Sequence, residues 1–169
     1  MKKIFLTAVM LLVPTFASAS DLISPTSEPQ LYCLAQNIYY EARSSSRADQ
    51  MAVSDVVLNR VKDRRYPNTI CEVVYQGKQK PSWKDPTKMV MVRNMCQFSW
   101  YCDGKKDEPP EGDPWRNAQM VAYEMYYLYK DANITDGATH YHAFYVKPDW
   151  AKTFILKGRI GSHIFYKQK

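Results

Sequence analysis

Hydrophobic residues recur at three- and four-residue intervals in the first part of the chain, which is the spacing of amphipathic helices. Residues 30–43 carry one such stripe, and we predict a helix there. A serine cluster ends this helix, and Ser46 with Asp49 three positions later resembles an N-terminal capping pair. A second helix is therefore expected to begin near Arg47 and to end ahead of Pro67. Together the two helices form a hairpin.

The second half of the chain predicts one more helix and then strands. Asp113 followed by Pro114 is typical of an N-cap and a first-turn proline. The apolar stripe that follows is expected to be buried, and it consists of Trp115, Ala118, Ala122, Met125 and Tyr129. Extended segments are then expected at residues 139–146, 153–156 and 163–167, with Gly158 and Gly161 marking turns.

Residues 68–111 have no clear period and contain four prolines, so long loops around short elements are expected there. Helices therefore come first and a small antiparallel sheet comes last. The pattern predicts an α+β fold that is mainly helical with a small C-terminal sheet.

The N-terminus has the three-part layout of a secretory signal peptide. Lys2 and Lys3 precede an apolar run at residues 4–13, and small residues follow up to Ala19. The run is shorter than the roughly 20 apolar residues that cross a bilayer, so cleavage after Ala19 is expected. We predict a signal peptide at residues 1–19, a short lead at 20–30, and one domain at 31–169.

The exported chain would be basic, with 21 basic and 17 acidic side chains after residue 19. This charge suits nucleic acid, anionic lipid or an acidic wall polymer, and export to the periplasm, cell wall or medium argues against nucleic acid. No second hydrophobic span follows, so we expect no stable membrane insertion after cleavage. A monomer is expected.

Four cysteines lie in the exported part, which is typical of disulfides formed in an oxidising compartment. Cys96 with Cys102 would close a short loop, which leaves Cys33 with Cys71, although four cysteines allow three pairings. A zinc site is the alternative, but no Cys-x-x-Cys pair is present.

Glu41 is the first candidate for chemistry, because it lies at the rim of the apolar stripe beside Tyr39 and Tyr40. Partial dehydration raises the pKa of a carboxyl group. A carboxyl group needs such a raised pKa in order to protonate a glycosidic oxygen near neutral pH. The alternative interpretation is that Glu41 forms an ion pair with Arg43 or a neighbouring cation at the surface.

His140 and His142 lie two apart in a predicted strand and therefore share a face. With His163 they could hold a metal ion as in a zinc amidase or peptidase, or they could be hydrogen-bonded strand residues. We predict no metal and no cofactor.

Six ordered blocks of the chain form a recognisable set. They are Asn37-Ile-Tyr-Tyr-Glu-Ala-Arg43, Ala52-Val-Ser-Asp-Val-Val-Leu-Asn-Arg-Val61, Tyr66-Pro-Asn-Thr-Ile-Cys-Glu-Val-Val-Tyr-Gln76, Cys96-Gln-Phe-Ser-Trp-Tyr-Cys-Asp-Gly104, Gly137-Ala-Thr-His-Tyr-His142 and Ile160-Gly-Ser-His-Ile-Phe-Tyr166. Together they resemble the SleB/CwlJ family of cell wall hydrolases over nearly the whole exported chain.

The resemblance implies a lysozyme-like, lytic-transglycosylase-like domain with Glu41 as its essential acid. It implies cleavage of the β-1,4 bond between N-acetylmuramic acid and N-acetylglucosamine in peptidoglycan glycan strands. The family often continues Glu-Ala-Arg with Gly-Glu, whereas this chain has Ser44 and Ser45. One carboxylate favours a lytic transglycosylase that makes 1,6-anhydromuramic ends over a muramidase-type hydrolase, which uses two.

The expected substrate-binding residues come from the cysteine-flanked loop and from the first predicted strand. They are Gln97, Phe98, Ser99, Trp100, Asp103, His140 and Tyr141, with Asp103 as the best candidate for a second acid. Besides the zinc enzyme, the remaining alternative is a wall-binding protein without activity.

Overall fold

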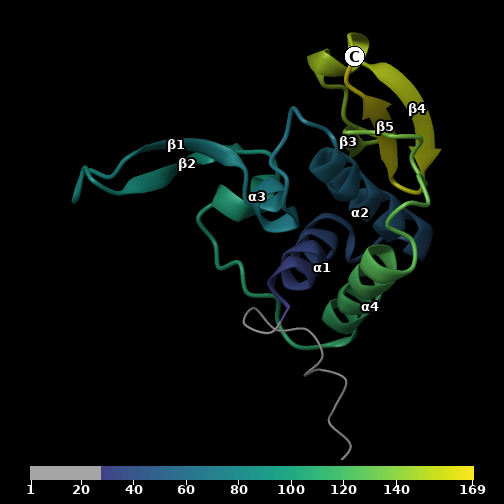
Figure 1. Ribbon diagram of the computed structural model, residues 1–169, viewed down its shortest axis with the longest axis horizontal. Coiled ribbons are helices and arrows are strands. Elements are labelled where there is room, and N and C mark those ends of the chain that lie inside the picture. The colour runs from purple at the N-terminus through teal and green to yellow at the C-terminus, as the bar shows by residue number, and fades with distance from the viewer. Residues whose placement is uncertain (1–27) are drawn as a thin grey trace, which may run out of the picture.

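The computed structural model describes residues 28–169, so the predicted signal peptide and most of the predicted lead lie outside the described residues. Helix α1 (Pro29–Ala42) occupies the centre of the domain, and α2 (Arg47–Lys62), α3 (Ile70–Val74) and α4 (Asp113–Tyr127) pack against it (Figure 1). Buried residues of α1, including Leu34 and Ile38, form the main core with Val57, Val73 and Met125.

A three-stranded antiparallel sheet covers the other side of α2 (Figure 1). Its strands are β3 (His140–Ala143), β4 (Ile155–Ile160) and β5 (His163–Lys167), in the order β3-β5-β4. Ala52 and Val56 of α2 meet Phe165 of β5 in a second small core. Helix α2 is thus buried on two sides, which explains why polar Asp49, Asp55 and Arg60 are buried within it.

The two helices of the predicted hairpin and the third helix are present close to the expected bounds. The cap prediction at Ser46 is confirmed, because its side chain accepts a hydrogen bond from the Asp49 amide at 3.3 Å. Two details were wrong. Gly112, not Asp113, is the N-cap of α4, and this helix ends at Tyr127, which leaves Tyr129 exposed instead of buried.

The predicted strand at 139–146 was too long, because the chain turns after Ala143 and Val146 bonds back to the Ala143 carbonyl at 2.9 Å. The strand predicted at 153–156 is displaced to Ile155–Ile160. Gly158 is not in a turn between strands but in β4, at a register irregularity, with a φ of 140°.

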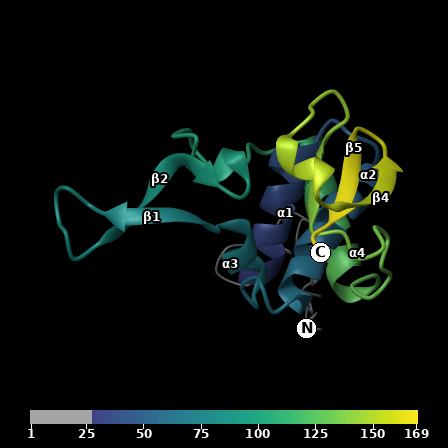
Figure 2. The same cartoon turned by 90° about the horizontal axis from the view of Figure 1, so that it is seen from above.

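The region expected to be irregular contains a hairpin that the sequence pattern did not predict. Strands β1 (Gly77–Pro81) and β2 (Met89–Cys96) pair as a separate two-stranded sheet that projects from the domain (Figures 1 and 2). A short 3-10 helix, η2 (Ser99–Cys102), follows β2, and a second one, η3 (Asp149–Lys152), precedes β4. We call residues 77–96 the arm.

The cysteines form two disulfides, Cys33–Cys71 and Cys96–Cys102. The first joins α1 to α3. The second closes the segment that joins β2 to η2, and this segment borders the site described next. Within residues 28–169, no helix is long and apolar enough to cross a membrane.

Candidate active site

Glu41 is the second-last residue of α1, where the helix ends beside α2 and the sheet. The amide side chain of Gln50 donates to the Ala42 carbonyl at 3.1 Å and so satisfies one of the free carbonyls at the helix end. The position of Glu41 relative to α2 is therefore fixed by a buried contact.

A cavity of about 130 Å³ opens at this point. Four separate parts of the chain line it: α1, α2, residues 97–99 from the end of β2 to the start of η2, and β3. The lining residues are Glu41, Arg60, Gln97, Phe98, Ser99 and Tyr141. The structure thus brings four of the seven predicted substrate-binding residues to the cavity of Glu41.

The hydroxyl of Tyr141 donates a hydrogen bond to Oε2 of Glu41 at 3.2 Å. Burial raises the pKa of Glu41 above its ordinary value, while the Tyr141 bond and the nearby His163 and Arg60 act in the opposite direction. Burial also raises the pKa of Tyr141 well above 10, and the adjacent Glu41 adds to this effect. Tyr141 therefore keeps its proton and remains a donor to Glu41.

Arg60 is a buried cation that lines the same cavity. Its Nε donates to the Thr139 carbonyl at 2.7 Å, and its guanidinium lies 5.2 Å from the centre of the Phe98 ring. Among the described residues, its Nη1 has no hydrogen-bond partner. Arg60 thus places a positive charge beside Glu41 without forming an ion pair with it.

The strand that carries Tyr141 is held by polar side chains of α2. Buried Asp55 accepts hydrogen bonds from the amide and hydroxyl of Thr135, at 2.9 and 2.6 Å, and Asn59 donates to the Ala138 carbonyl at 3.1 Å. Together with Arg60, these contacts fasten residues 135–139 to α2. The chain then enters β3 with Tyr141 directed towards Glu41.

His163 lies behind Tyr141, and the centres of the two rings are 5.1 Å apart. Nδ1 of His163 is 2.8 Å from Oδ1 of buried Asp49, whose Oδ2 accepts from the Ser162 amide at 2.9 Å. Asp49 therefore fixes the orientation of the imidazole that packs on Tyr141.

Two more of the predicted residues, Trp100 and Asp103, lie one cavity further along. This neighbouring hollow, of about 310 Å³, shares Ser99 with the first one and is also lined by Tyr40, Arg43 and Asp107. Trp100 is largely buried, stacks on Tyr40 with ring centres 4.6 Å apart, and donates to Asn37 at 3.2 Å. Its role in the fold is therefore to support the Tyr40 face of the hollow.

Asp103 does not line the cavity of Glu41. Its carboxylate accepts a hydrogen bond from the Lys105 amide at 2.8 Å, and bonding to Lys105 lowers the pKa of Asp103. Asp107, in the same hollow, has a pKa that burial and the nearby Asp103 raise. Glu41 is the one acid among the residues that line its own cavity.

His140 does not lie in either cavity, although it is next to Tyr141 in the chain. Successive residues of a strand point to opposite faces, so His140 and Tyr141 cannot both face Glu41. His140 packs instead against Trp150 and Phe154, with ring centres 5.4 and 4.6 Å away. The prediction that it lines the cleft conflicts with this packing.

The three histidines are divided between the two faces of the sheet. His140 and His142 lie on the face with Trp150, whereas His163 lies on the face with Tyr141. In residues 28–169 no group of three His, Cys, Asp or Glu side chains is arranged to hold a metal ion. The three-histidine arrangement required by the zinc-enzyme alternative is not formed.

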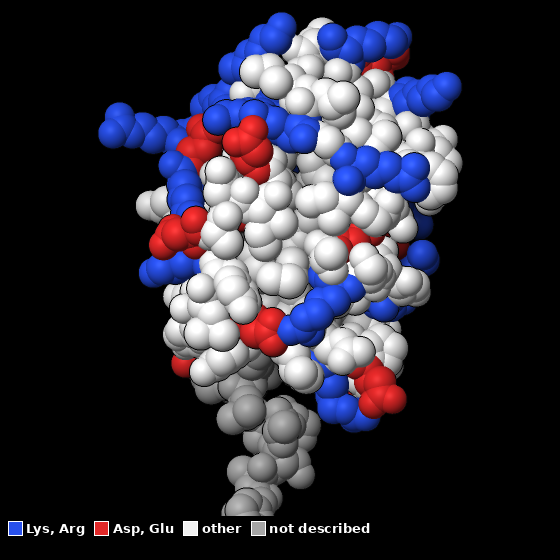
Figure 3. All heavy atoms as spheres, turned by 90° about the vertical axis from the view of Figure 1, so that its right-hand side faces the viewer, with Lys and Arg blue, Asp and Glu red and all other residues white. Residues whose placement is uncertain are grey.

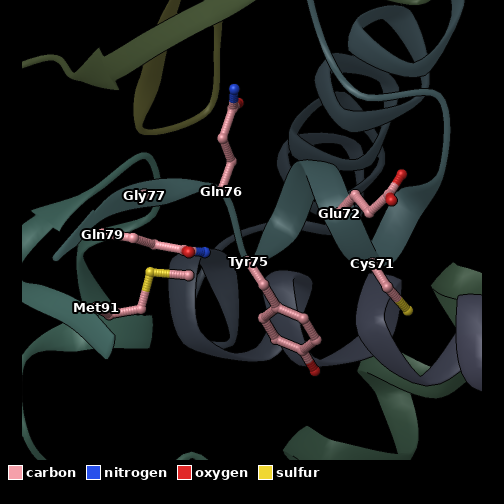
Figure 4. A pocket seen from close by; sticks show the side chains of 7 residues that line it. All are labelled: Cys71, Glu72, Tyr75, Gln76, Gly77, Gln79 and Met91. Atoms are coloured by element: carbon pink, nitrogen blue, oxygen red, sulfur yellow. The ribbon is translucent and has the colours of Figure 1, made fainter. Parts of the chain in front are cut away.

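A larger hollow, of about 380 Å³, lies between α3 and the base of the arm (Figure 4). It is lined by Cys71, Glu72, Tyr75, Gln76, Gly77, Gln79 and Met91. Its acid, Glu72, accepts a hydrogen bond from Thr69 at 2.8 Å, and the Tyr75 hydroxyl donates to Gln36. In Figure 4 the Gln76 side chain points away from the other polar groups, so this hollow offers no convergent chemistry.

Comparison with known proteins identifies the class. The family model described as Cell Wall Hydrolase matches residues 44–166, and the chain belongs to this family. The match begins three residues after Glu41, so the role of Glu41 rests on the geometry above. No curated protein matches the chain.

Two solved structures share the fold. One is the catalytic domain of the germination-specific lytic transglycosylase SleB from Bacillus anthracis, with 22% identity, a TM-score of 0.56, and coverage of 92% of this chain and 100% of that chain. The other is the catalytic domain of the Bacillus cereus SleB protein, with 23% identity, a TM-score of 0.54, and coverage of 92% and 95%. The predicted fold class and the resemblance to SleB-type cell wall hydrolases are confirmed.

Proposed function

We propose that this chain is an exported peptidoglycan lytic transglycosylase in which Glu41 acts first as general acid and then as general base. The observation that carries the proposal is a single, partly dehydrated carboxyl group in a cavity with a neutral hydroxyl donor and a buried cation beside it. The family membership supports a wall substrate.

In the first step, protonated Glu41 donates its proton to the oxygen of the β-1,4 bond between N-acetylmuramic acid and N-acetylglucosamine. The bond from that oxygen to the muramic anomeric carbon breaks, and N-acetylglucosamine leaves as an alcohol. Glu41 becomes a carboxylate, which the Tyr141 hydroxyl and the Arg60 charge stabilise.

In the second step, the Glu41 carboxylate takes the proton of the muramic C6 hydroxyl while that oxygen bonds to the anomeric carbon. The product is a 1,6-anhydromuramic end, Glu41 is protonated again, and no water is consumed. A second carboxylate is not required, whereas retaining and inverting hydrolases place two about 5 to 10 Å apart across the scissile bond.

The remaining cavity residues have proposed binding roles. Gln97 and Ser99 present exposed polar side chains that can hydrogen-bond N-acetyl or hydroxyl groups of the sugar. Phe98 is buried and forms the floor between them. The hollow with Tyr40 and Asp103 would receive the next sugar along the strand, because it adjoins the first cavity at Ser99.

The proposal includes cleavage of residues 1–19 during export, a short lead at 20–30 and a catalytic domain at 31–169 that acts as a monomer in the periplasm or cell wall. A muramidase-type hydrolase that uses Asp103 as its second acid is the alternative reaction. It requires Asp103 to act on the same bond as Glu41 from the neighbouring hollow.

Mass spectrometry of muropeptides released from purified sacculi distinguishes these reactions. Residues 20–169 and the same chain with Glu41→Gln are each incubated with and without EDTA. Anhydromuropeptides from the wild type alone, unaffected by EDTA, are the expected result. Reducing muramic ends would instead show hydrolysis, and free stem peptides that disappear with EDTA would overturn the glycosidase assignment.

A further inference from the structure

The arm is strongly basic. Residues 77–96 contain five basic side chains and one acidic side chain, whereas the rest of residues 28–169 contains 16 basic and 15 acidic ones. On the face seen in Figure 3, away from the arm, the centre is largely uncharged, and basic side chains outnumber acidic ones around its upper end. The arm is therefore a strongly basic projecting element, and residues 139–169, with six basic side chains and one acidic side chain, form a second basic part of the domain.

The single acid of the arm is used within the arm. Asp85 accepts hydrogen bonds from the amide and hydroxyl of Thr87, at 3.2 and 2.6 Å, and pairs with Lys88 at 3.4 Å. Within residues 28–169, the ammonium groups of Lys78, Lys80 and Lys84 form no ion pair. These three charges are free to meet an anionic partner.

Large apolar side chains accompany these charges. Trp83, in the loop at the end of the arm, is 87% exposed, and Met89 and Val90 at the start of β2 are also exposed. Nζ of Lys84 lies 5.4 Å from the centre of the Trp83 ring. Register pairs Met89 with Pro81 and Val90 with Lys80, so apolar and basic groups alternate around the same end of the arm.

This set of groups fits a lipid headgroup region better than a sugar. A sugar site needs free hydrogen-bonding groups beside the aromatic ring, but the polar groups of the loop bond to one another. The Ser82 amide donates to the Lys88 carbonyl at 2.8 Å, and its hydroxyl accepts from the Lys84 amide at 3.3 Å. An indole, thioethers and ammonium groups remain, and these suit the interface of an anionic bilayer.

We propose that the end of the arm docks reversibly on anionic phospholipid membranes, with Trp83 entering the headgroup region and Lys80 and Lys84 contacting lipid phosphates. The arm extends away from the helices, so docking leaves the domain beside the membrane rather than within it (Figure 2). This is peripheral binding, separate from the catalytic proposal.

Vesicle flotation tests the docking. Residues 20–169 with Glu41→Gln, the variant expected to be inactive, are mixed with vesicles of phosphatidylcholine alone or with about one-third phosphatidylglycerol, and binding to purified sacculi is measured in parallel. We expect at least about tenfold tighter binding to the anionic vesicles, weakened by 0.5 M NaCl because salt screens charge. Tryptophan emission should shift to shorter wavelength on binding, and this shift should be lost in Trp83→Ala.

Two arm variants and one matched control locate the surface. Trp83→Ala and Lys80→Gln/Lys84→Gln should each weaken vesicle binding at least about fivefold, whereas Lys130→Gln/Lys147→Gln, which removes the same charge elsewhere, should not. Circular dichroism establishes that each variant is folded. The proposal would be overturned if the folded parent bound both kinds of vesicle equally or bound neither. It would also be overturned if the arm variants lost only sacculus binding, which would make the end of the arm a glycan-binding surface.

Discussion

Tyr141 on β3 donates to Oε2 of Glu41 on α1 at 3.2 Å, across 100 positions of the chain. The contact joins the sheet to the central helix at the point where the proposed chemistry occurs. Burial raises the pKa of Glu41, and this bond limits the rise. The pair therefore sets the pH range in which Glu41 can donate a proton.

Replacing Tyr141 with phenylalanine is expected to raise the pKa of Glu41, because the carboxylate loses a donor that lowers this pKa. A general acid is active below its own pKa, so the alkaline limb of the kcat profile should move to higher pH by about one unit. The measurement is release of anhydromuropeptides between pH 5 and 9. Tyr145→Phe, an exposed tyrosine on the following turn, is the control and should leave the limb in place.

Replacing Arg60 with methionine should move the same limb in the same direction, since a positive charge beside the carboxylate is lost. It should also lower the melting temperature, because the Thr139 carbonyl loses its buried donor, at a cost of about 1 to 3 kcal/mol. Arg60→Lys, which keeps the charge, should restore most of the pH profile. An alkaline limb that is unchanged in Arg60→Met would show that the Arg60 charge does not act on Glu41.

The two disulfides are expected to have different roles. Cys96→Ser/Cys102→Ser opens the segment that holds Gln97, Phe98 and Ser99 and should reduce activity several-fold with a small loss of stability. Cys33→Ser/Cys71→Ser, in which the two cysteines are 38 positions apart, should lower the free energy of unfolding by up to about 4 kcal/mol. Urea unfolding and muropeptide release measure the two effects. Equal losses of stability in both variants would contradict this division.

We expect His140 to lower the free energy of unfolding in mild acid. Burial lowers its pKa to about 4, and the charges of Arg60 and Arg65 contribute. An unfolded histidine titrates near 6.5, so the unfolded chain takes up more protons between about pH 6.5 and 4, and stability falls as the pH falls through this window. The loss should be at most about 3 kcal/mol, and His140→Phe should remove it in urea unfolding at pH 7.5 and 4.5. An unaltered pH dependence in the variant would refute this assignment.

Local sequence determined much of this protein. The period of the apolar residues and the Ser46 cap determined α1, α2 and α4, because these signals lie within a few residues of one another. The position of Glu41 at the rim of a buried stripe marked it as a candidate for the same reason. The arm was missed because the alternation of β2 is interrupted and neither face of it is buried in a core.

The tertiary structure alone decided which side chains surround Glu41. Arg60 reaches the cavity because α2 lies between α1 and the sheet, and the bonds of Asp55 and Asn59 to residues 135–138 set the entry into β3. The pleat of that strand then selects Tyr141 and turns His140 away. Such choices depend on contacts between segments about 80 to 100 residues apart, and no local pattern encodes the face on which each segment packs.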